Sequence, residues 1–573
     1  FWVCVRRSME RDGKTVIPAL RQRYGPGSQP KPPAGMSRAV VATPARRVLF
    51  AGLYSGMTAG CFYGFGIYSP ALKKHFALSQ QQLMNINTIP YAFGVFSFFW
   101  GMVTKKMGPT FSMWVGGTLL TTSQVFMYSL GTSWVELPAY LPPPITLVAT
   151  NCVTYWGMQL VSSAAFTAPI LHFPQYRGDV ASIVKSFVGV SGSVTTTLFV
   201  LIWGTPKGDQ TALNALLLWA SISAAMNFAA GACVPRSYDA ASARSEPRRM
   251  LTALFWTLVM LGVLGIFSHG HADSLVHNVV ISLLIILSIA PVLVIFSGLT
   301  GDRDVCAIDV DQDPHTRPAT MSIATTAPKK STAIFESPQQ YSCTEVLGTL
   351  DAWLFVFVGV VVVGSGTFFA TNCAQIISSS GASTELVPTT ITLFSSGNLL
   401  GRLLCNIPSD TMVRHGWPRP LFLVALAAGA AVAQVALLFA ARLPAESEEQ
   451  SMLLQFGAGL CGLAFGAIWP HFVVLSSELF GSTHLSSNYM FFDGTAGAIG
   501  TLLLANALPS LIYQAASKGS LDCDGPMCFG PTHAIIAGLC TAAAGAAGAM
   551  AVRSVALYRQ ISAAQRQSAQ ELL

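Results

Sequence analysis

Charged residues are scarce in this sequence. Lys and Arg together number 33 and Asp and Glu number 26 among 573 residues, whereas 52% of the residues are hydrophobic. So few charges cannot cover the surface of a soluble globular protein of this length. The scarcity excludes the soluble class, and a mean hydropathy of +0.52 indicates a chain that lies in a lipid bilayer.

Motifs for nucleotide binding and for nucleophilic catalysis are absent as well. The phosphate-binding pattern G-x-x-x-x-G-K-[ST] does not occur, which argues against ATP-driven pumping. No nucleophile elbow or clustered metal-ligand motif lies inside the apolar runs. We therefore expect no enzymatic activity and no cofactor.

The chain has 12 cysteines, but almost none of them is placed near another cysteine in a polar loop, as a disulfide pair would be. Most are scattered singly along apolar runs, where a small buried hydrophobic role is the simplest interpretation. Cys523 and Cys528 differ, because they flank the tetrapeptide DGPM in a polar loop. A disulfide between them would require this loop to face an oxidising compartment.

Apolar runs recur along the whole chain, and each is long enough to cross roughly 30 Å of hydrocarbon as an α-helix. They predict an all-α polytopic membrane protein with about fourteen spans. The spans are arranged as six, two and six: 48–71, 83–104, 111–131, 145–166, 180–203 and 212–234; then 250–268 and 277–299; then 350–372, 387–407, 419–442, 452–474, 488–513 and 532–552.

This arrangement predicts two six-helix halves joined by two central helices and a long loop. We interpret residues 1–35 either as disordered or as translation upstream of a start at Met36. The predicted segments are a basic disordered stretch at 1–47, an N-terminal half at 48–234, a linker with two extra spans at 235–299, a disordered cytosolic loop at 300–349, a C-terminal half at 350–552 and a cytosolic tail at 553–573.

Basic residues gather on one side of these spans. Examples are Arg46 and Arg47, Lys105 and Lys106, and Arg553. The positive-inside rule assigns that side to the cytosol, so both termini are cytosolic and the loop with Cys523 lies on the opposite side. We expect a monomeric integral protein of the plasma membrane or an organellar membrane, whose partners are the bilayer, a small-molecule substrate and a coupling proton. The net charge of +7 reflects this bias and gives no reason to expect nucleic acid.

Short charged loops follow the second span of each half, in GMVTKKMGPT (101–110) and within 397–420. Both resemble the cytosolic signature of the major facilitator superfamily, G-x-x-x-D-R/K-x-G-R/K, whose charges lock helix ends together and release them as the halves rock. In the first copy Lys105 replaces the acid, and in the second Asn406 replaces the glycine. The predicted charge lock comprises Gly101, Lys105, Lys106, Gly108, Arg402, Asp410, Arg414 and Glu478. Charges that only set topology at the membrane edge are the alternative, above all for Lys106 and Arg419.

A closer resemblance follows from several motifs in fixed order. They are GFGIYSPALKKHFALSQQQL (64–83), FPQYRGDVASIVKSFVGVSG (173–192), the 397–420 loop, SSELFG (476–481) and CDGPMCF (523–529). Together they resemble the hallmarks of the nodulin-like family within the major facilitator superfamily, over most of residues 48–552. The resemblance implies a membrane transporter with the major facilitator fold and leaves the substrate open.

Two charges inside predicted spans are the sharpest substrate-binding candidates. Lys185 and Asp493 lie at similar depths of the fifth span of each half. A charge at the centre of a membrane helix costs about 2.5–3.5 kcal/mol, so each needs a partner, water or substrate. We predict that Lys185 binds an anionic group such as a carboxylate and that Asp493 pairs with it or takes up a coupling proton. The alternative for Lys185 is snorkelling to the nearby cytosolic surface.

Polar residues on two other spans extend the predicted substrate site. Asn151, Tyr155 and Gln159 recur at i, i+4 and i+8 and form one helix stripe, while Asn372 and Gln375 end the ninth span. We expect them to line a central cavity. Hydrogen bonding between helices is the alternative for the stripe.

The turn SHGHADSLVH supplies a possible metal site, with His269, His271, Asp273 and His277 as ligands for Zn²⁺ or Fe²⁺. A solvated polar turn is the simpler explanation.

Taken together, these features favour a gradient-coupled secondary transporter of a small polar or anionic solute, a carboxylate or an amino acid, that works by alternating access. A transporter of metals or metal complexes and a non-transporting receptor on the same scaffold are the alternatives.

Overall fold

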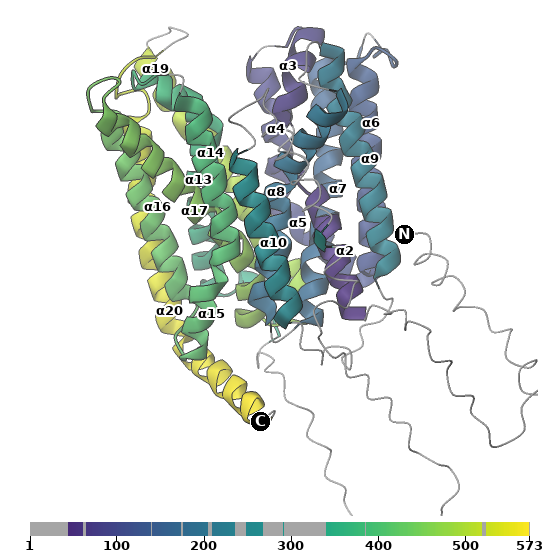
Figure 1. Ribbon diagram of the computed structural model, residues 1–573, viewed down its shortest axis with the longest axis vertical. Helices are drawn as coiled ribbons and strands as arrows, with labels where there is room; N and C mark the ends of the chain where they lie inside the picture. Colours follow the sequence, from purple (N-terminus) through teal and green to yellow (C-terminus); the bar gives the residue numbers. More distant parts are fainter. Residues whose placement is uncertain are drawn as a thin grey trace, which may run out of the picture.

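Two helical bundles lie side by side in the computed structural model, with a further helix, α10 (Arg248–Phe267), between them (Figure 1). All regular secondary structure in the described residues is helical. The structure describes residues 44–60, 65–78, 80–138, 140–173, 176–203, 209–234, 248–267, 290–291, 340–383, 386–517 and 523–571.

The N-terminal bundle precedes α10 in the sequence, and the C-terminal bundle follows it. The first consists of α2 (Pro44–Thr58), α3 (Phe65–His75), α4 (Gln80–Ala92), η2 (Phe93–Phe96), α5 (Ser97–Met107), α6 (Pro109–Gly131), α7 (Pro143–His172), α8 (Arg177–Trp203) and α9 (Asp209–Cys233). The second consists of α13 (Leu350–Ser379), α14 (Leu386–Leu404), α15 (Asn406–Arg414), α16 (Pro420–Ala440), α17 (Glu448–Leu479), α18 (Leu485–Ile499), the π-helical η5 (Gly500–Ala507), α19 (Leu508–Ser517) and α20 (Gly530–Glu571). A short helix, α12 (Cys343–Leu347), comes before α13.

Helices make up most of the described part of each predicted span, and seven helices in the described part are long and apolar enough to cross a membrane. The prediction of an all-α polytopic membrane protein is therefore confirmed. The total of about fourteen stays a prediction, because the span at 277–299 lies almost wholly outside the described residues. The first span is not one helix, since α2 ends at Thr58 and a turn follows at Ala59 and Gly60.

Two helix ends show how local sequence sets the boundaries. Gly108 has φ 88°, a conformation that glycine adopts without strain, and it lets the chain reverse between α5 and α6, whose first residue is Pro109. By contrast, α20 continues to Glu571, beyond the predicted end of its span at 552. No Gly or Pro follows Gly548 within α20, so nothing in the sequence stops the helix at the membrane edge.

Helices α14 and α17 pack backbone against backbone. A Cβ added to Gly397, Gly401, Gly462 or Gly466 would collide with the main chain of the facing helix. Small residues allow such close approach in membranes, where helix association depends on van der Waals contact rather than on expelling water. This pair fixes α17 firmly in the C-terminal bundle, and α17 carries one wall of the site described below.

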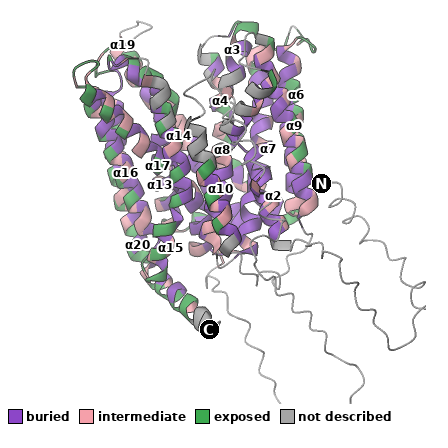
Figure 2. Ribbon diagram, in the orientation of Figure 1, coloured by how far each residue is buried: buried purple, intermediate pink, exposed green. Residues whose placement is uncertain are grey.

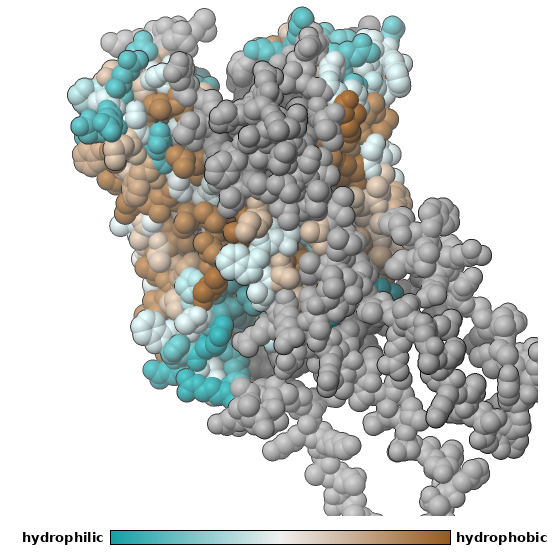
Figure 3. All heavy atoms as spheres, in the orientation of Figure 1, coloured by the Kyte–Doolittle hydropathy of each residue, from teal (hydrophilic) through white to brown (hydrophobic). Residues whose placement is uncertain are grey.

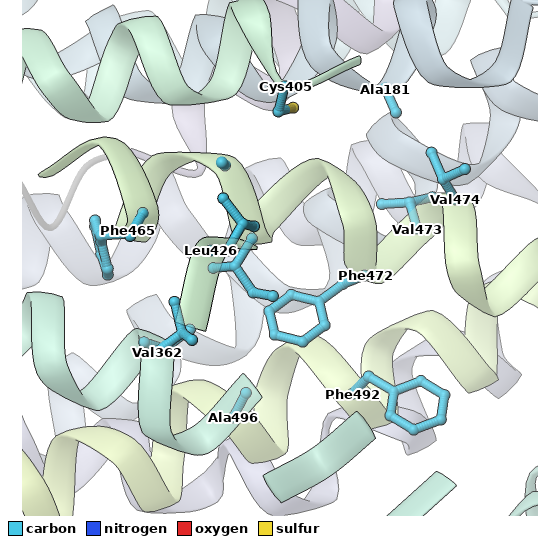
Figure 4. Close-up of a cluster of buried hydrophobic side chains, with 14 of the residues drawn as sticks. Ala181, Val362, Cys405, Leu426, Phe465, Phe472, Val473, Val474, Phe492 and Ala496 are labelled. Atoms are coloured by element: carbon cyan, nitrogen blue, oxygen red, sulfur yellow. The ribbon is translucent and has the colours of Figure 1, made fainter. Parts of the chain in front are cut away.

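Burial follows the bundle geometry, because buried residues line the helix contacts and exposed residues lie on the outer faces (Figure 2). Figure 4 shows the core of the C-terminal bundle, where Phe472, Phe492 and Val362 pack together, and Ala181 of α8 comes close to it. Large apolar side chains also face outward, such as Phe96, Met452 and Phe439. On the visible face of the C-terminal bundle, Figure 3 shows an apolar region between hydrophilic ends, as expected for a surface in contact with lipid.

The two bundles approach each other at one end, which we call the closed end. There α5 packs against α18, and α8 packs against α14. At the other end, marked by α3 and α19, the ribbons of the two bundles lie farther apart (Figure 1). The two charged residues predicted at the substrate site, Lys185 of α8 and Asp493 of α18, meet at a contact between the bundles, so this asymmetry positions the site.

Candidate functional site

Lys185 and Asp493 meet where the two bundles touch. Lys185 projects from α8 and Asp493 from α18, and the distance from Nζ to Oδ1 is 2.8 Å. The ammonium also donates to the hydroxyl of Tyr489 at 2.6 Å, and this hydroxyl donates to the same carboxylate oxygen at 3.0 Å. Tyr489 precedes Asp493 by four residues on α18, so one helix face presents both groups to the lysine.

Three aromatic rings surround the ammonium of Lys185, and we call them the aromatic cage: Phe166 of α7, Trp469 of α17 and Tyr489 of α18. Their centroids lie 4.0, 5.4 and 4.9 Å from Nζ. Cation–π attraction and the ion pair together offset the desolvation of a residue that is only 4% exposed. In this conformation Lys185 points to Asp493 and does not snorkel to a surface.

Arg402 adds a second positive charge beside the cage. It belongs to α14 and is 2% exposed. Its Nη1 donates to the main-chain oxygen of Lys185 at 2.9 Å, its Nε donates to Asn398 Oδ1 at 3.0 Å, and its guanidinium carbon lies 5.9 Å from the centroid of Trp469. The sequence prediction assigned Arg402 to the charge lock, whereas the structure places it next to Lys185.

The three residues of the predicted polar stripe on α7 have different surroundings. Asn151 donates to the main-chain oxygen of Ile86 in α4 at 2.8 Å, which is the helix-to-helix bond that was the alternative interpretation. Tyr155 packs against Tyr91 with ring centroids 5.3 Å apart. Gln159 is 3% exposed, and its Oε1 has no hydrogen-bond partner within the described part of the chain. Gln159 is therefore the stripe residue with unused hydrogen-bonding capacity.

The predicted pair on α13 is separate from this centre. Asn372 donates to the main-chain oxygens of Phe368 in its own helix, at 2.9 Å, and of Ala505 in the π-helical η5, at 3.3 Å. Wider π-helical turns leave carbonyl groups accessible, which suits this contact. Gln375 is exposed. These contacts place Asn372 at the junction of α13 and η5 rather than at the Lys185–Asp493 pair.

The charge lock of the second copy centres on Arg419, not on Arg402 or Arg414. Arg419 binds Glu478 through two parallel contacts of 2.9 Å, and its Nη1 lies 2.6 Å from Asp410 Oδ1. The planar guanidinium matches a carboxylate in this two-bond geometry, which explains why a nearly buried arginine is stable between two acids. Arg414 is exposed at the end of α15. Sequence spacing alone could not distinguish three arginines within one short segment.

Asp410 and Asn406 also contact the other bundle. The amide of Asn406 donates to the main-chain oxygen of Gly178, and a Cβ at Gly178 would lie 2.6 Å from Asp410 Oδ2. Gly178 is in the first turn of α8, where the helix dipole favours a negative charge. The asparagine that replaces the signature glycine therefore serves as a hydrogen-bond donor across the closed end.

The first copy of the signature joins the bundles through uncharged contacts and one lysine. The main-chain oxygen of Gly101 accepts a bond of 2.9 Å from the Ser486 hydroxyl, and Lys105 Nζ lies 2.9 Å from His484 Nδ1. Lys106 is exposed, and Gly108 forms the turn described above. Lys105, where the signature has an acid, faces the positive N-terminal end of α18, and the lone pair of a neutral His484 supplies its acceptor.

A short segment before α13 covers this junction. The main-chain N–H of Thr483 donates to Gln340 Oε1 at 2.9 Å, and Asn488 Nδ2 donates to the main-chain oxygen of Tyr341 at 3.0 Å. Hydrogen bonds from the backbone and hydroxyl of Ser342 lower the pKa of Glu345, which keeps its carboxylate ionised beside His484. Burial and the Lys105 ammonium lower the pKa of His484, and Glu345 opposes this shift.

The remaining predicted sites lie away from these contacts. Cys523 and Cys528 form a disulfide in the loop before α20. The turn with His269, His271, Asp273 and His277 lies outside the described residues. Within the part that the structure describes, no group of three or more His, Cys, Asp or Glu side chains could hold a metal ion.

Sequence reasoning missed the aromatic cage and His484. One signal was present for Tyr489, because its spacing of four residues from Asp493 puts both on one helix face. Phe166 and Trp469 carry no such signal, since aromatic residues in spans most often serve packing or interface anchoring. His484 was missed because its importance depends on Lys105, which is 379 residues away in the sequence.

Comparison with known proteins agrees with this architecture. Residues 47–296 match the family model described as Nodulin-like. The chain is similar to the Arabidopsis thaliana protein NUCLEAR FUSION DEFECTIVE 4, with 23% identity over 528 residues and coverage of 84% of each chain. Among solved structures, it is similar to the proton:xylose symporter XylE of the major facilitator superfamily bound to 6-bromo-6-deoxy-D-glucose, with a TM-score of 0.51, 13% identity and coverage of 88% of this chain and 94% of that one. The predicted resemblance to the nodulin-like family and the major facilitator fold is thereby confirmed.

Proposed function

Because this chain is nodulin-like over residues 47–296 and has the major facilitator fold, we propose that it is a secondary active transporter of a small organic anion. The solute is a carboxylate or an amino acid, and a proton gradient drives its movement. The membrane is the plasma membrane or an organellar membrane, and the closed end faces the cytosol together with both termini, as the distribution of basic residues favours. The protein works as a monomer.

The observation that carries this proposal is the Lys185–Asp493 pair. It joins α8 of one bundle to α18 of the other, inside the aromatic cage. A buried ion pair is a poor source of stability, because desolvation offsets most of the attraction. A role in transport explains the pair better, because it lies between two bundles that must separate and a charged solute can replace one of its two residues.

In the proposed cycle the solute carboxylate replaces Asp493 as the partner of Lys185. The ammonium keeps an anion beside it throughout, so the lysine is never left buried without a counter-ion. Asp493, released from Lys185, would be a buried unpaired carboxylate, and proton uptake removes this charge. The hydroxyl of Tyr489 contacts both groups and guides the exchange. Coupling of solute and proton follows from the charge balance of one site.

The closed end then has to open to release the solute. The contacts that must separate include the hydrogen bond between Ser486 and Gly101, the Lys105–His484 contact and the bond from Asn406 to Gly178. Each of these three is a polar contact, and water can take over its hydrogen bonds when the bundles separate. This suits rocking of two rigid bundles around a central site.

Uptake into proteoliposomes tests this proposal. The panel contains labelled benzoate, lactate, succinate and glutamate, each assayed with and without an imposed pH gradient. The parent should accumulate at least one of them and accumulate more with the gradient, whereas Lys185→Ala should lose uptake. Lys74→Ala, an exposed lysine in the last turn of α3, serves as the control and should retain uptake.

Two outcomes would contradict the proposal. If the folded parent takes up none of the four acids, the proposal of an anion transporter is wrong. If it also binds one of them, the receptor alternative is favoured. Uptake that Lys185→Ala leaves intact would separate transport from the Lys185–Asp493 pair.

A further inference from the structure

The indole N–H of Trp469 is a buried donor without a use. Its Nε1 is inaccessible to water and has no hydrogen-bond partner within the described part of the chain. Burying such a donor unpaired costs about 1–3 kcal/mol. The cost is removed if a ligand accepts the bond.

The surroundings of the ring point to the charge of that ligand. Lys185 Nζ lies 5.4 Å and the Arg402 guanidinium carbon 5.9 Å from the Trp469 centroid. Both cations are nearly buried, and one of them comes from each bundle. Of the three charged groups at this centre, two are positive and only Asp493 is negative. An N–H donor next to two cations favours an oxyanion.

We propose that the indole N–H of Trp469 binds an oxygen of the transported anion, between Lys185 and Arg402, and thereby selects carboxylates over their neutral analogues. This inference rests on the proposed transport function and adds a specificity-determining residue to it. The aromatic ring contributes a second effect, because its face stabilises both cations before the anion arrives. A phenylalanine would keep this face but would lack the donor.

Trp219 supplies a matched control. Trp219 is fully buried whereas Trp469 is partly buried, and the Nε1 of each is a buried donor with no hydrogen-bond partner among the described residues. Trp219 packs in an apolar cluster with Leu120 and Val161. Trp219→Phe and Trp469→Phe remove the same atoms, including an indole N–H that has no partner among the described residues. Only Trp469 lies beside Lys185 and Arg402, so a role in anion binding predicts an effect for Trp469→Phe alone.

The test measures uptake of labelled benzoate, lactate, succinate and glutamate by the parent, Trp469→Phe and Trp219→Phe in proteoliposomes. Trp469→Phe should raise KM for each transported acid by about 10- to 100-fold, the change expected when one hydrogen bond to a charged group is lost, with the maximal rate within about twofold of the parent. Trp219→Phe should leave KM unchanged. For the parent, benzamide should compete with benzoate at least about tenfold more weakly than unlabelled benzoate does, and Trp469→Phe should narrow this difference.

The failures are distinguishable. If the parent transports an acid and Lys185→Ala abolishes uptake, but Trp469→Phe keeps the parental KM, the inference falls and the transport proposal stands. If both tryptophan variants raise KM equally, Trp469 serves packing and the inference also falls. If the folded parent transports none of the four acids, both proposals fall together.

Discussion

Lys185 and Asp493 occupy equivalent places in the two bundles. Counting from the first residue of each helix, Arg177 for α8 and Leu485 for α18, each is the ninth residue, and their charged atoms meet at 2.8 Å. Equal depth on two facing helices brings opposite charges together without distortion of either helix. The pair therefore links the bundles at the same level from both sides, and several consequences can be measured.

Removing one member of this pair should destabilise the protein more than removing both. Lys185→Ala or Asp493→Leu leaves an uncompensated buried charge and should cost about 3–5 kcal/mol in the free energy of unfolding. The double variant Lys185→Met/Asp493→Leu removes both charges and should recover most of that loss. Thermal unfolding of the purified variants in detergent measures the effect. Uptake should be absent in all three, and a double variant as unstable as the singles would contradict a coupled pair.

A larger side chain where Gly494 of α18 contacts Gly94 of η2 should disfavour the conformation in which the closed end is shut. A Cβ at Gly494 of α18 would clash with the main-chain oxygen of Gly94 and lie 2.5 Å from Ser97 Cβ. Overpacking costs about 1–3 kcal/mol, so Gly494→Ala should shift the equilibrium away from this conformation by about 5- to 150-fold. Distances between spin labels placed on α5 and α18 report the shift.

A control for this substitution lies one turn further along α18. A Cβ at Gly497 would meet no atom within 4 Å. Gly497→Ala should therefore leave the label distances as in the parent and raise helix stability slightly. Equal shifts from both substitutions would show that helix propensity, and not the contact between Gly494 and Gly94, is responsible.

Arg419 should tolerate lysine poorly. The Arg419 side chain is 4% exposed and forms bonds to both Glu478 and Asp410. Lysine keeps the charge but cannot make two parallel bonds to Glu478, so Arg419→Lys should lower the unfolding midpoint, and Arg419→Ala should lower it further by leaving two acids unpaired. Arg442→Lys, at an exposed arginine, is the matched control and should leave the midpoint unchanged. A midpoint for Arg419→Lys equal to that of Arg442→Lys would argue against a bidentate lock.

Acid on the side of the closed end should loosen it through His484. Burial, and after it the Lys105 ammonium, lowers the pKa of His484 below its ordinary value near 6.5 while the bundles touch, and Glu345 opposes this shift. Separation of the bundles removes Lys105, so the open state binds the proton more tightly. Neutral His484 therefore favours the closed over the open conformation above about pH 6.5, and this contribution is lost as the pH falls through the lowered pKa of His484. Label distances across α5 and α18, recorded from pH 8 to pH 5, should increase with acid.

The glutamine variant isolates this titration. His484→Gln keeps an acceptor for Lys105 but cannot take up a proton, so its label distances should not respond to pH. His415 is an exposed histidine of the same end, and its Nδ1 lies 2.8 Å from the main-chain oxygen of Thr411 in its own segment, so His415→Gln should respond to pH as the parent does. A pH response that survives His484→Gln would assign it to another group.

The Cys523–Cys528 disulfide provides a test of orientation. The loop also bonds to α13 through the N–H of Gly525 and the main-chain oxygen of Ser379, at 2.7 Å. Replacing both cysteines by serine should cost about 2 kcal/mol, as expected for a loop this short. In intact cells a membrane-impermeant maleimide should label this loop only after reduction and only from the non-cytosolic side. Labelling of the unreduced protein would mean that the disulfide is absent.

The sequence by itself determined the architecture. Runs such as those of α13 and α16 must become helices, because a backbone in hydrocarbon satisfies its hydrogen bonds only within its own segment. The depth of Lys185 and Asp493 was also readable, since helical rise is constant. The disulfide pair was evident because two cysteines stood alone in one polar loop.

Tertiary structure decided which side chains act on one another. Arg402, Arg414 and Arg419 are equivalent in the sequence, yet one lies beside Lys185, one is exposed and one binds two acids. Asn151 proved to join helices, and Trp469 and His484 gained their roles only from residues hundreds of positions away. The formation of a helix depends on interactions within one segment. Contacts between side chains of different bundles depend on how closely the bundles approach, and the sequence of a single segment does not reveal that distance.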